Sequence, residues 1–183
     1  MDAYLTTERL VLRWLTPSDV DDLVALDSDP EVMKYLTGGK PSKRETVERT
    51  LLDACEYEAG YGRWAAFETA TGVFVGWFAL TRDGRHPPDE AELGYRLRRA
   101  AWGNGYASEG SRALLRKAFT ELGTQRVWAE TMFVNARSRA VMERIGLRFV
   151  RVFHVHFDDP IEGTEHGEVE YEIRRDDWLG GRP

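Results

Sequence analysis

Hydrophobic residues in the first 60 positions predict one strand followed by helices. Leu10 and Leu12 fall on one side of an extended segment, as in a β-strand with one buried face. Thr16 is then suited to cap a helix that we expect to reach about Asp27. Two further helices are expected over DPEVMKYL and over PSKRETVERTLLDACEYEAGYG, the second with a Ser42–Glu45 capping box and a stop at Gly60 or Gly62.

The hydrophobic period changes to two after residue 62. RWAAFET and VFVGWFALT flank the turn residues ATG, which predicts a hairpin, and AELGYRL is a third strand. Helical periodicity returns in ASEGSRALLRKAFTEL and in NARSRAVMERI, with the strand QRVWAETMFV between them. The last two predicted strands are LRFVRVFHVHFD and GEVEYEI. The pattern predicts one α+β (α/β) domain over residues 1–183, with a mostly antiparallel central sheet flanked by helices.

Composition and charge exclude several classes of protein. The net charge of −6 is opposite to that expected of a nucleic-acid-binding protein and mildly favours cationic partners such as amines. No apolar run is long enough to span a membrane, and the N-terminus lacks the features of a signal peptide. Cys55 is the single cysteine, so no intramolecular disulfide can form. We therefore expect a cytoplasmic protein, monomeric or homodimeric, without nucleic-acid or membrane partners.

The stretch AWGNGYASEG, residues 101–110, has the composition of an anion-binding loop. Glycines at 103 and 105 bring bare backbone amides to the start of a helix, where an anion is stabilised. A P-loop is excluded because no Gly-Lys-Ser/Thr follows. A dinucleotide fingerprint is disfavoured because Ser108 replaces its third glycine and five residues separate the strand from Gly103. A plain turn at a helix start remains the alternative for this stretch taken alone.

A second motif, NARSRAVMERIGL, stands about thirty residues further on. With it, the chain resembles the GNAT (Gcn-related N-acetyltransferase) superfamily, and especially its ribosomal-protein N-terminal acetyltransferase subgroup. The resemblance covers roughly residues 5–175 and includes RLVLR, ELGYRL, WGNGYASE and Asn135, Ser138 and Gly146 of the second motif. The sequence departs from the family pattern at Trp102, where a basic or amide residue is usual, and at Leu147, where the family has Phe.

The resemblance implies acetyl-CoA as the cosubstrate. Its pyrophosphate would lie on residues 103–107, and its pantetheine arm would pair with the strand near Tyr95–Leu97. This pairing requires the strands near 91–97 and 126–134 to splay apart. The expected cofactor-binding residues are Tyr95, Arg96, Leu97, Trp102, Gly103, Asn104, Gly105, Tyr106, Ala107, Asn135, Ser138 and Met142.

The implied reaction is attack of an amine on the thioester, and it needs a group that accepts a proton. Glu92 lies on the strand that leads to the loop, on the same face as Gly94, and is the predicted general base. Glu130 and His154 are the alternatives. The family's usual acid, a Tyr seven residues after the Asn, is replaced here by Met142, so Ser138 is the candidate that assists the leaving sulfur.

His154 and His156 would share one face of a strand, but no third ligand is placed by spacing, and we expect no metal site. The sequence thus predicts an acetyl-CoA-dependent N-acetyltransferase acting on a small-molecule amine or a protein N-terminus. The alternative is a non-catalytic acyl-CoA-binding or sensor domain on the same fold.

Overall fold

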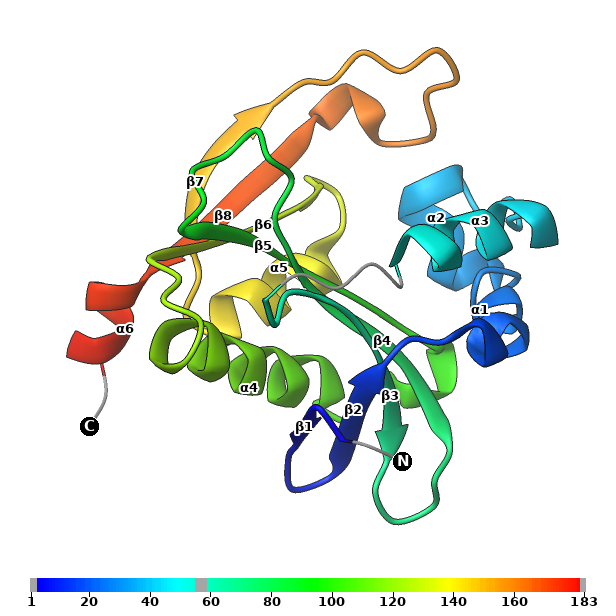
Figure 1. Ribbon diagram of the computed structural model, residues 1–183. Coiled ribbons are helices and arrows are strands. Elements are labelled where there is room, and N and C mark those ends of the chain that lie inside the picture. Colours follow the sequence, from blue (N-terminus) through cyan, green and yellow to red (C-terminus); the bar gives the residue numbers. More distant parts are fainter. Residues whose placement is uncertain (1–2, 55–58, 182–183) are drawn as a thin grey trace.

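The structure is a computed structural model that describes residues 3–54 and 59–181, and its centre is one twisted eight-stranded sheet (Figure 1). The strand order is β1-β2-β3-β4-β5-β6-β8-β7, and β5 with β6 is the parallel pair. All the other neighbouring strands pair antiparallel. The strands are β1 (Leu5–Thr6), β2 (Leu10–Trp14), β3 (Gly62–Glu68), β4 (Phe74–Thr81), β5 (Glu90–Leu97), β6 (Arg126–Met132), β7 (Arg148–Phe153) and β8 (Glu168–Arg174).

Helices cover both faces of this sheet. On one face, α4 (Tyr106–Thr120) and α5 (Ala136–Arg144) enclose the main core, which includes Trp64, Phe78 and Tyr171. On the other, α1 (Val20–Leu26), α2 (Pro30–Thr37) and α3 (Arg44–Ala54) form a separate group (Figure 1) beside β3 and β4. α6 (Arg175–Gly180) follows β8, and three 3-10 turns lie at Pro17–Asp19, Arg99–Ala101 and Thr164–His166. The predicted α+β architecture is confirmed.

A glycine sets how closely α4 approaches the sheet. A Cβ added at Gly110 would lie 2.4 Å from the Phe78 ring of β4, so only glycine fits there. The same helix buries Leu114, Leu115 and Phe119 against the sheet. This tight packing fixes the N-terminus of α4, and with it the loop that precedes the helix, relative to β4 and β5.

The predicted splay is present between β5 and β6. The two strands pair only at Glu90–Arg126, Ala91–Val127 and Glu92–Trp128. Beyond Glu92, β5 continues beside β4 as far as Leu97, while β6 continues beside β8. The Arg126 guanidinium holds the paired end together, because it contacts the Glu90 carboxylate at 2.6 Å. Among the residues that the structure describes, no strand pairs with the backbone edge of β5 from Gly94 to Leu97 on the β6 side.

Two local predictions were wrong. α3 begins at Arg44 rather than at a Ser42–Glu45 capping box, since the Ser42 amide donates to the Asp27 carbonyl and the Lys43 carbonyl accepts the first helical amides. Of the two expected stops, Gly62 lies within β3 instead, and residues 55–58 of the expected helix lie outside the described residues.

β7 ends at Phe153, which pairs with the first residue of β8, so His154 and His156 lie in the following loop rather than in a strand.

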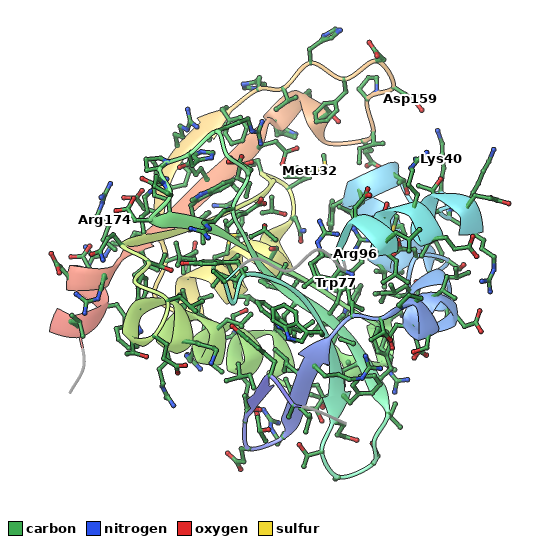
Figure 2. All side chains as sticks on the ribbon, in the orientation of Figure 1. Lys40, Trp77, Arg96, Met132, Asp159 and Arg174 are labelled. Atoms are coloured by element: carbon green, nitrogen blue, oxygen red, sulfur yellow. The ribbon has the colours of Figure 1, made fainter. Side chains whose placement is uncertain are left out.

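That loop leaves the sheet and extends toward α2 (Figures 1 and 2). The Lys40 ammonium lies 3.0 Å from the Asp159 carboxylate, although both side chains are well exposed. Near this ion pair, a Cβ added at Gly38 would lie 3.1 Å from the Ile161 side chain. The loop after β7 thus contacts the segment that follows α2.

Candidate active site

The loop between β5 and α4 presents unpaired backbone amides. Gly103 and Gly105 have φ values of 77° and 81°, a left-handed conformation that favours glycine. Gly105 is the N-cap of α4, and the amides from Gly105 to Ser108 have no acceptor among the described residues. A Cβ at Gly103 would meet nothing within 4 Å, so the approach to these amides is open. This arrangement fits a pyrophosphate at the positive end of the helix dipole.

The turn between β1 and β2 anchors this loop. The Arg9 guanidinium donates to the Asn104 carbonyl at 2.9 Å and to the Glu109 carboxylate at 2.7 Å. The Glu109 carboxylate also accepts from the Thr7 hydroxyl at 2.6 Å and the Arg9 amide at 2.8 Å. Because Glu109 lies in the first turn of α4, these bonds tie both sides of the loop to the sheet edge.

The polar groups of the Trp102 and Tyr106 side chains form hydrogen bonds within the protein. The Trp102 indole N–H donates to the Leu97 carbonyl at 2.8 Å, which leaves that group no donor for a phosphate. The Tyr106 hydroxyl donates to Glu68, and its ring is buried. Arg137, in the first turn of α5, lies with its guanidinium 4.8 Å from the Trp102 ring centroid. Sequence reasoning missed this cation, which stands beside the loop.

The N-terminus of α5 faces β5 across the splay. Asn135 is its N-cap, accepting from the Ser138 amide at 3.3 Å and donating to the Thr131 hydroxyl at 3.0 Å. The Ser138 hydroxyl lies 3.1 Å from the Tyr95 hydroxyl, so the structure brings these two predicted residues together. Burial raises the pKa of Tyr95 to about 12, which keeps its phenol protonated at neutral pH. Two hydroxyls therefore meet where the strands separate.

Glu92 occupies the last paired position of β5 before the splay. Its side chain is partly buried, and among the described residues its carboxylate has no hydrogen-bond or ion-pair partner. Burial raises the pKa of this carboxyl, and the nearby positive charge of Arg63 opposes the rise only in part. An unpaired carboxyl with a raised pKa is suited to accept a proton near neutral pH.

The two alternative bases are placed differently. Glu130 lies on β6 and is exposed, and burial of part of its side chain together with Glu92 and Glu170 raises the pKa of its carboxyl. His154 lies beyond the end of β7, with its ring nitrogen 3.4 Å from the Glu165 carbonyl. Of the three, Glu92 alone lies on β5 itself, next to the free backbone edge.

Other predicted cofactor residues are buried or point elsewhere. Met142 is only 2% exposed and belongs to the main core, and Leu97 is 7% exposed. The Arg96 side chain turns away from the loop and forms an ion pair of 2.6 Å with Asp27. Their roles as contacts of the cosubstrate stay predictions, and for Arg96 and Leu97 they concern the backbone of β5.

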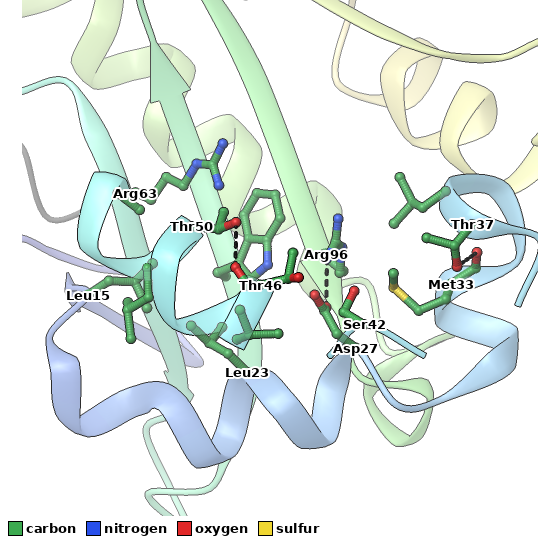
Figure 3. Close-up of a pocket in the computed structure, with 15 residues that line it drawn as sticks. Leu15, Leu23, Asp27, Met33, Thr37, Ser42, Thr46, Thr50, Arg63 and Arg96 are labelled. Atoms are coloured by element: carbon green, nitrogen blue, oxygen red, sulfur yellow. Dashed lines mark hydrogen bonds and ion pairs between the residues drawn. The ribbon is translucent and has the colours of Figure 1, made fainter. Parts of the chain in front are cut away.

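A cavity of about 240 Å³ adjoins β5 on the face covered by α1–α3 (Figure 3). Arg63, Trp77 and Arg96 line it from β3, β4 and β5, respectively, and Figure 3 labels the side chains of the two arginines. Leucine, valine and methionine side chains from α1–α3 line the other wall. Such a cavity is suited to a small acceptor substrate, and its position could not be derived from the sequence.

Among residues 3–54 and 59–181, no group of His, Cys, Asp and Glu is arranged to hold a metal ion. No helix in these ranges is long and apolar enough to cross a membrane.

Comparison with known proteins agrees with this geometry. Residues 9–148 match the family described as "Acetyltransferase (GNAT) domain". The chain is 40% identical over 184 residues to "FsC-acetyl coenzyme A-N(2)-transacetylase" of Aspergillus fumigatus, a match that covers 96% of this chain and 77% of that protein. It is also 27% identical to YdaF of Bacillus subtilis, a candidate ribosomal N-acetyltransferase, over 94% of this chain and 95% of that protein.

The fold itself recurs in solved structures. Spermidine N-acetyltransferase from Vibrio cholerae, in complex with CoA and spermine, superposes with a TM-score of 0.77. The superposition covers 93% of this chain and 98% of that one at 18% sequence identity, so it speaks for the fold alone. The family match and the 40% identical relative, together with the open amides and the splay, carry the assignment: the chain belongs to the GNAT family and is an acetyl-CoA-dependent N-acetyltransferase.

Proposed function

We propose that this enzyme acetylates a primary amine, either of a small molecule or of a protein N-terminus, with Glu92 as the general base. The unpaired, partly buried Glu92 carboxyl beside the splay carries this proposal. Relatives support the acceptor class, since one is named as an N(2)-transacetylase and another as a candidate ribosomal N-acetyltransferase. Acetyl-CoA is the cosubstrate, held by the amides of residues 103–107 and by the free edge of β5.

The chemistry follows from this placement. The neutral amine attacks the thioester carbonyl carbon, so that a C–N bond forms and the C–S bond breaks. The nitrogen releases one proton to the Glu92 carboxylate, directly or through water, and the sulfur leaves with the electron pair of the C–S bond. Backbone amides at the splay can stabilise the carbonyl oxygen as it gains negative charge. The products are an amide and free CoA.

The hydroxyls of Tyr95 and Ser138 are placed to assist the departing sulfur. The two hydroxyl oxygens lie 3.1 Å apart on the two sides of the splay. One hydroxyl can therefore donate a hydrogen bond to the sulfur while it accepts a hydrogen bond from the other. A free thiol has a pKa of about 8.5, so a thiolate can also leave unaided near neutral pH. We therefore assign this pair a supporting role in the reaction.

Ser138→Ala is expected to lower kcat by up to about tenfold with an unchanged KM for acetyl-CoA, because it removes an interaction made in the transition state. Pre-steady-state and steady-state kinetics with a fixed amine measure this. Tyr95→Phe is the companion variant, since it keeps the ring and removes the hydroxyl. If Ser138→Ala leaves kcat at the wild-type value while the chemical step limits turnover, Ser138 has no part in the reaction.

A panel of primary amines and of short peptides with free N-termini tests the proposal as a whole. Release of CoA should accompany formation of an N-acetyl product, identified by mass spectrometry. The same peptides with a blocked N-terminus and no other amine are the matched control and should give no product. If CoA binds and no amine in the panel is acetylated, the non-catalytic acyl-CoA-binding alternative gains support.

A further inference from the structure

Two arginine side chains from the sheet line the cavity beneath α1–α3. The Arg63 and Arg96 guanidinium carbons lie 5.3 Å and 5.2 Å from the Trp77 ring centroid, so both cations pack on one indole. The chain as a whole carries a net charge of −6, and two arginines side by side in a cavity stand out against it. Two adjacent cations on an acidic protein create a local positive potential, which favours an anionic ligand.

Of these two arginines, only Arg96 forms an ion pair among the described residues. Arg96 pairs with the Asp27 carboxylate at 2.6 Å. Among the described residues, the Arg63 guanidinium has no carboxylate within ion-pair distance and no hydrogen-bond acceptor, and its side chain packs on Trp77. Burial, and then the charge of Arg96, lower the pKa of Arg63, and the negative charges of Glu92 and Asp53, neither of which is in contact with its guanidinium, oppose this only in part. A partly buried guanidinium without an acceptor is unfavourable, and a bound anion would relieve it.

The sheet register places Arg63 near the reaction centre. Arg63 of β3 pairs with Ala79 of β4, and Ala79 pairs with Gly94 of β5. Arg63 therefore lies in the same row as Gly94, between the rows of Glu92 and Arg96 on the same face of the sheet. A ligand held at Arg63 can extend one short group toward Glu92 and the splay.

Apart from Arg63 and the Arg96–Asp27 ion pair, the cavity is mostly apolar, with hydroxyls from Thr37, Ser42, Thr46 and Thr50. Leu15, Leu23, Met33, Val47 and Leu51 line it. Thr37 and Thr50 donate to carbonyls of their own helical turns, so they offer little to a ligand. Apart from Arg63, the lining therefore favours a hydrophobic body over a chain of further charges.

We infer that the acceptor is an amino carboxylate with an apolar side chain, such as a hydrophobic amino acid. Its carboxylate is held by Arg63, its amine faces Glu92, and its side chain fills the space under α1–α3. The inference rests on the proposed function and names its substrate class. It disfavours polyamines, which carry no anion for Arg63 and would bring more positive charge next to two arginines.

The test compares acceptors that differ only at the carboxylate. L-leucine, L-leucinamide and 3-methylbutylamine share one apolar body, and L-phenylalanine with its amide forms a second set. Wild-type kcat/KM is expected to favour the acids by about 10- to 100-fold, as for other charge-assisted bonds. The amine of the amide loses its proton more readily, so this preference runs against intrinsic reactivity.

Arg63→Met should reduce the ratio of kcat/KM for acid over amide to near one, whereas Arg63→Lys should keep part of it. The ratio is the readout because a loss of folding, or a changed Glu92 pKa, would slow both members of a pair alike. Arg49→Met is the matched control: Arg49 is exposed on α3 and does not line the cavity, so its loss should leave the ratio unchanged.

The outcomes separate this inference from the proposed function. If wild-type enzyme acetylates leucinamide or 3-methylbutylamine as well as leucine, the inference is overturned and amine acetylation stands. If no amine is acetylated, the proposed function fails, and calorimetry on the CoA-loaded protein decides the carboxylate site. Binding of leucine but not leucinamide would then support Arg63 as an anion site, while equal binding or none would overturn it.

Discussion

Glu92→Gln should lower kcat by about 10²- to 10⁴-fold, the usual contribution of a general base. Glutamine keeps the shape of the side chain but cannot accept the proton of the attacking amine. Binding of CoA should be unchanged, because Glu92 lies at the paired end of β5 and away from residues 103–107. Steady-state kinetics of an accepted amine, with calorimetric titration of CoA on both proteins, measure the two effects.

Glu130→Gln is the matched control for this prediction. It removes a carboxyl on the neighbouring strand whose pKa is also raised, but which is exposed and lies on β6. Its effect on kcat should be less than about tenfold, as for an acid that only modulates the field around Glu92. A wild-type rate for Glu92→Gln together with a large loss for Glu130→Gln would transfer the role of base to Glu130.

The stability of Glu92→Gln is a further control. Since the folded-state pKa of Glu92 is raised, its ionised form is disfavoured by folding, and wild type is destabilised where Glu92 is charged. Glutamine removes this penalty, so the variant should unfold at the same or a higher temperature at neutral pH. The difference should vanish as the pH falls below the unfolded-state pKa, where Glu92 is protonated in both states.

Gly105→Asp should weaken CoA binding by about 100-fold or more. The substitution places a side chain at a φ of 81° and a negative charge among the amides that would hold the pyrophosphate. The new carboxylate would also lie beside Arg9, because a Cβ at residue 105 would be 3.5 Å from the Arg9 Nη2 atom. Calorimetric titration with CoA gives the loss directly.

Gly105→Asn separates charge from shape in this experiment. Asparagine has nearly the same size and tolerates the left-handed conformation, but it carries no charge. It should weaken CoA binding by about tenfold or less, with the thermal unfolding of both variants measured alongside. If Gly105→Asp binds CoA as tightly as wild type, the pyrophosphate does not lie on this loop.

Much of the fold was predictable from the sequence because local signals agreed with the tertiary structure. Alternation around Leu10 and Leu12 marked β2, whose two leucines are fully buried. Asn135 was recognised as a helix cap, and it caps α5. Gly103 and Gly105 were expected to form a turn at the start of a helix, and both adopt the left-handed backbone conformation that favours glycine. These features depend on few residues near in sequence, which a single sequence displays.

The cavity could not be predicted, because it depends on pairing between distant strands. Arg63, Trp77 and Arg96 come together only through the register of β3, β4 and β5. Arg137 beside Trp102 was missed for the same reason. His154 was predicted to lie in a strand because the alternation in FHVHF continues beyond Phe153. In the structure β7 ends at Phe153, which pairs with Glu168, the first residue of β8. Periodicity reports which face a side chain would take, not where pairing stops.

The pH dependence of kcat/KM for wild type and Glu92→Gln tests the central claim most directly. The wild-type profile should fall on the acidic side with a midpoint above the ordinary glutamate value of 4.5, since the Glu92 carboxyl must be ionised and its pKa is raised. Glu92→Gln should lose this limb and recover part of its rate at high pH, where more of the amine is already neutral. Profiles with the same acidic midpoint and the same rate in both proteins would contradict Glu92 as the base.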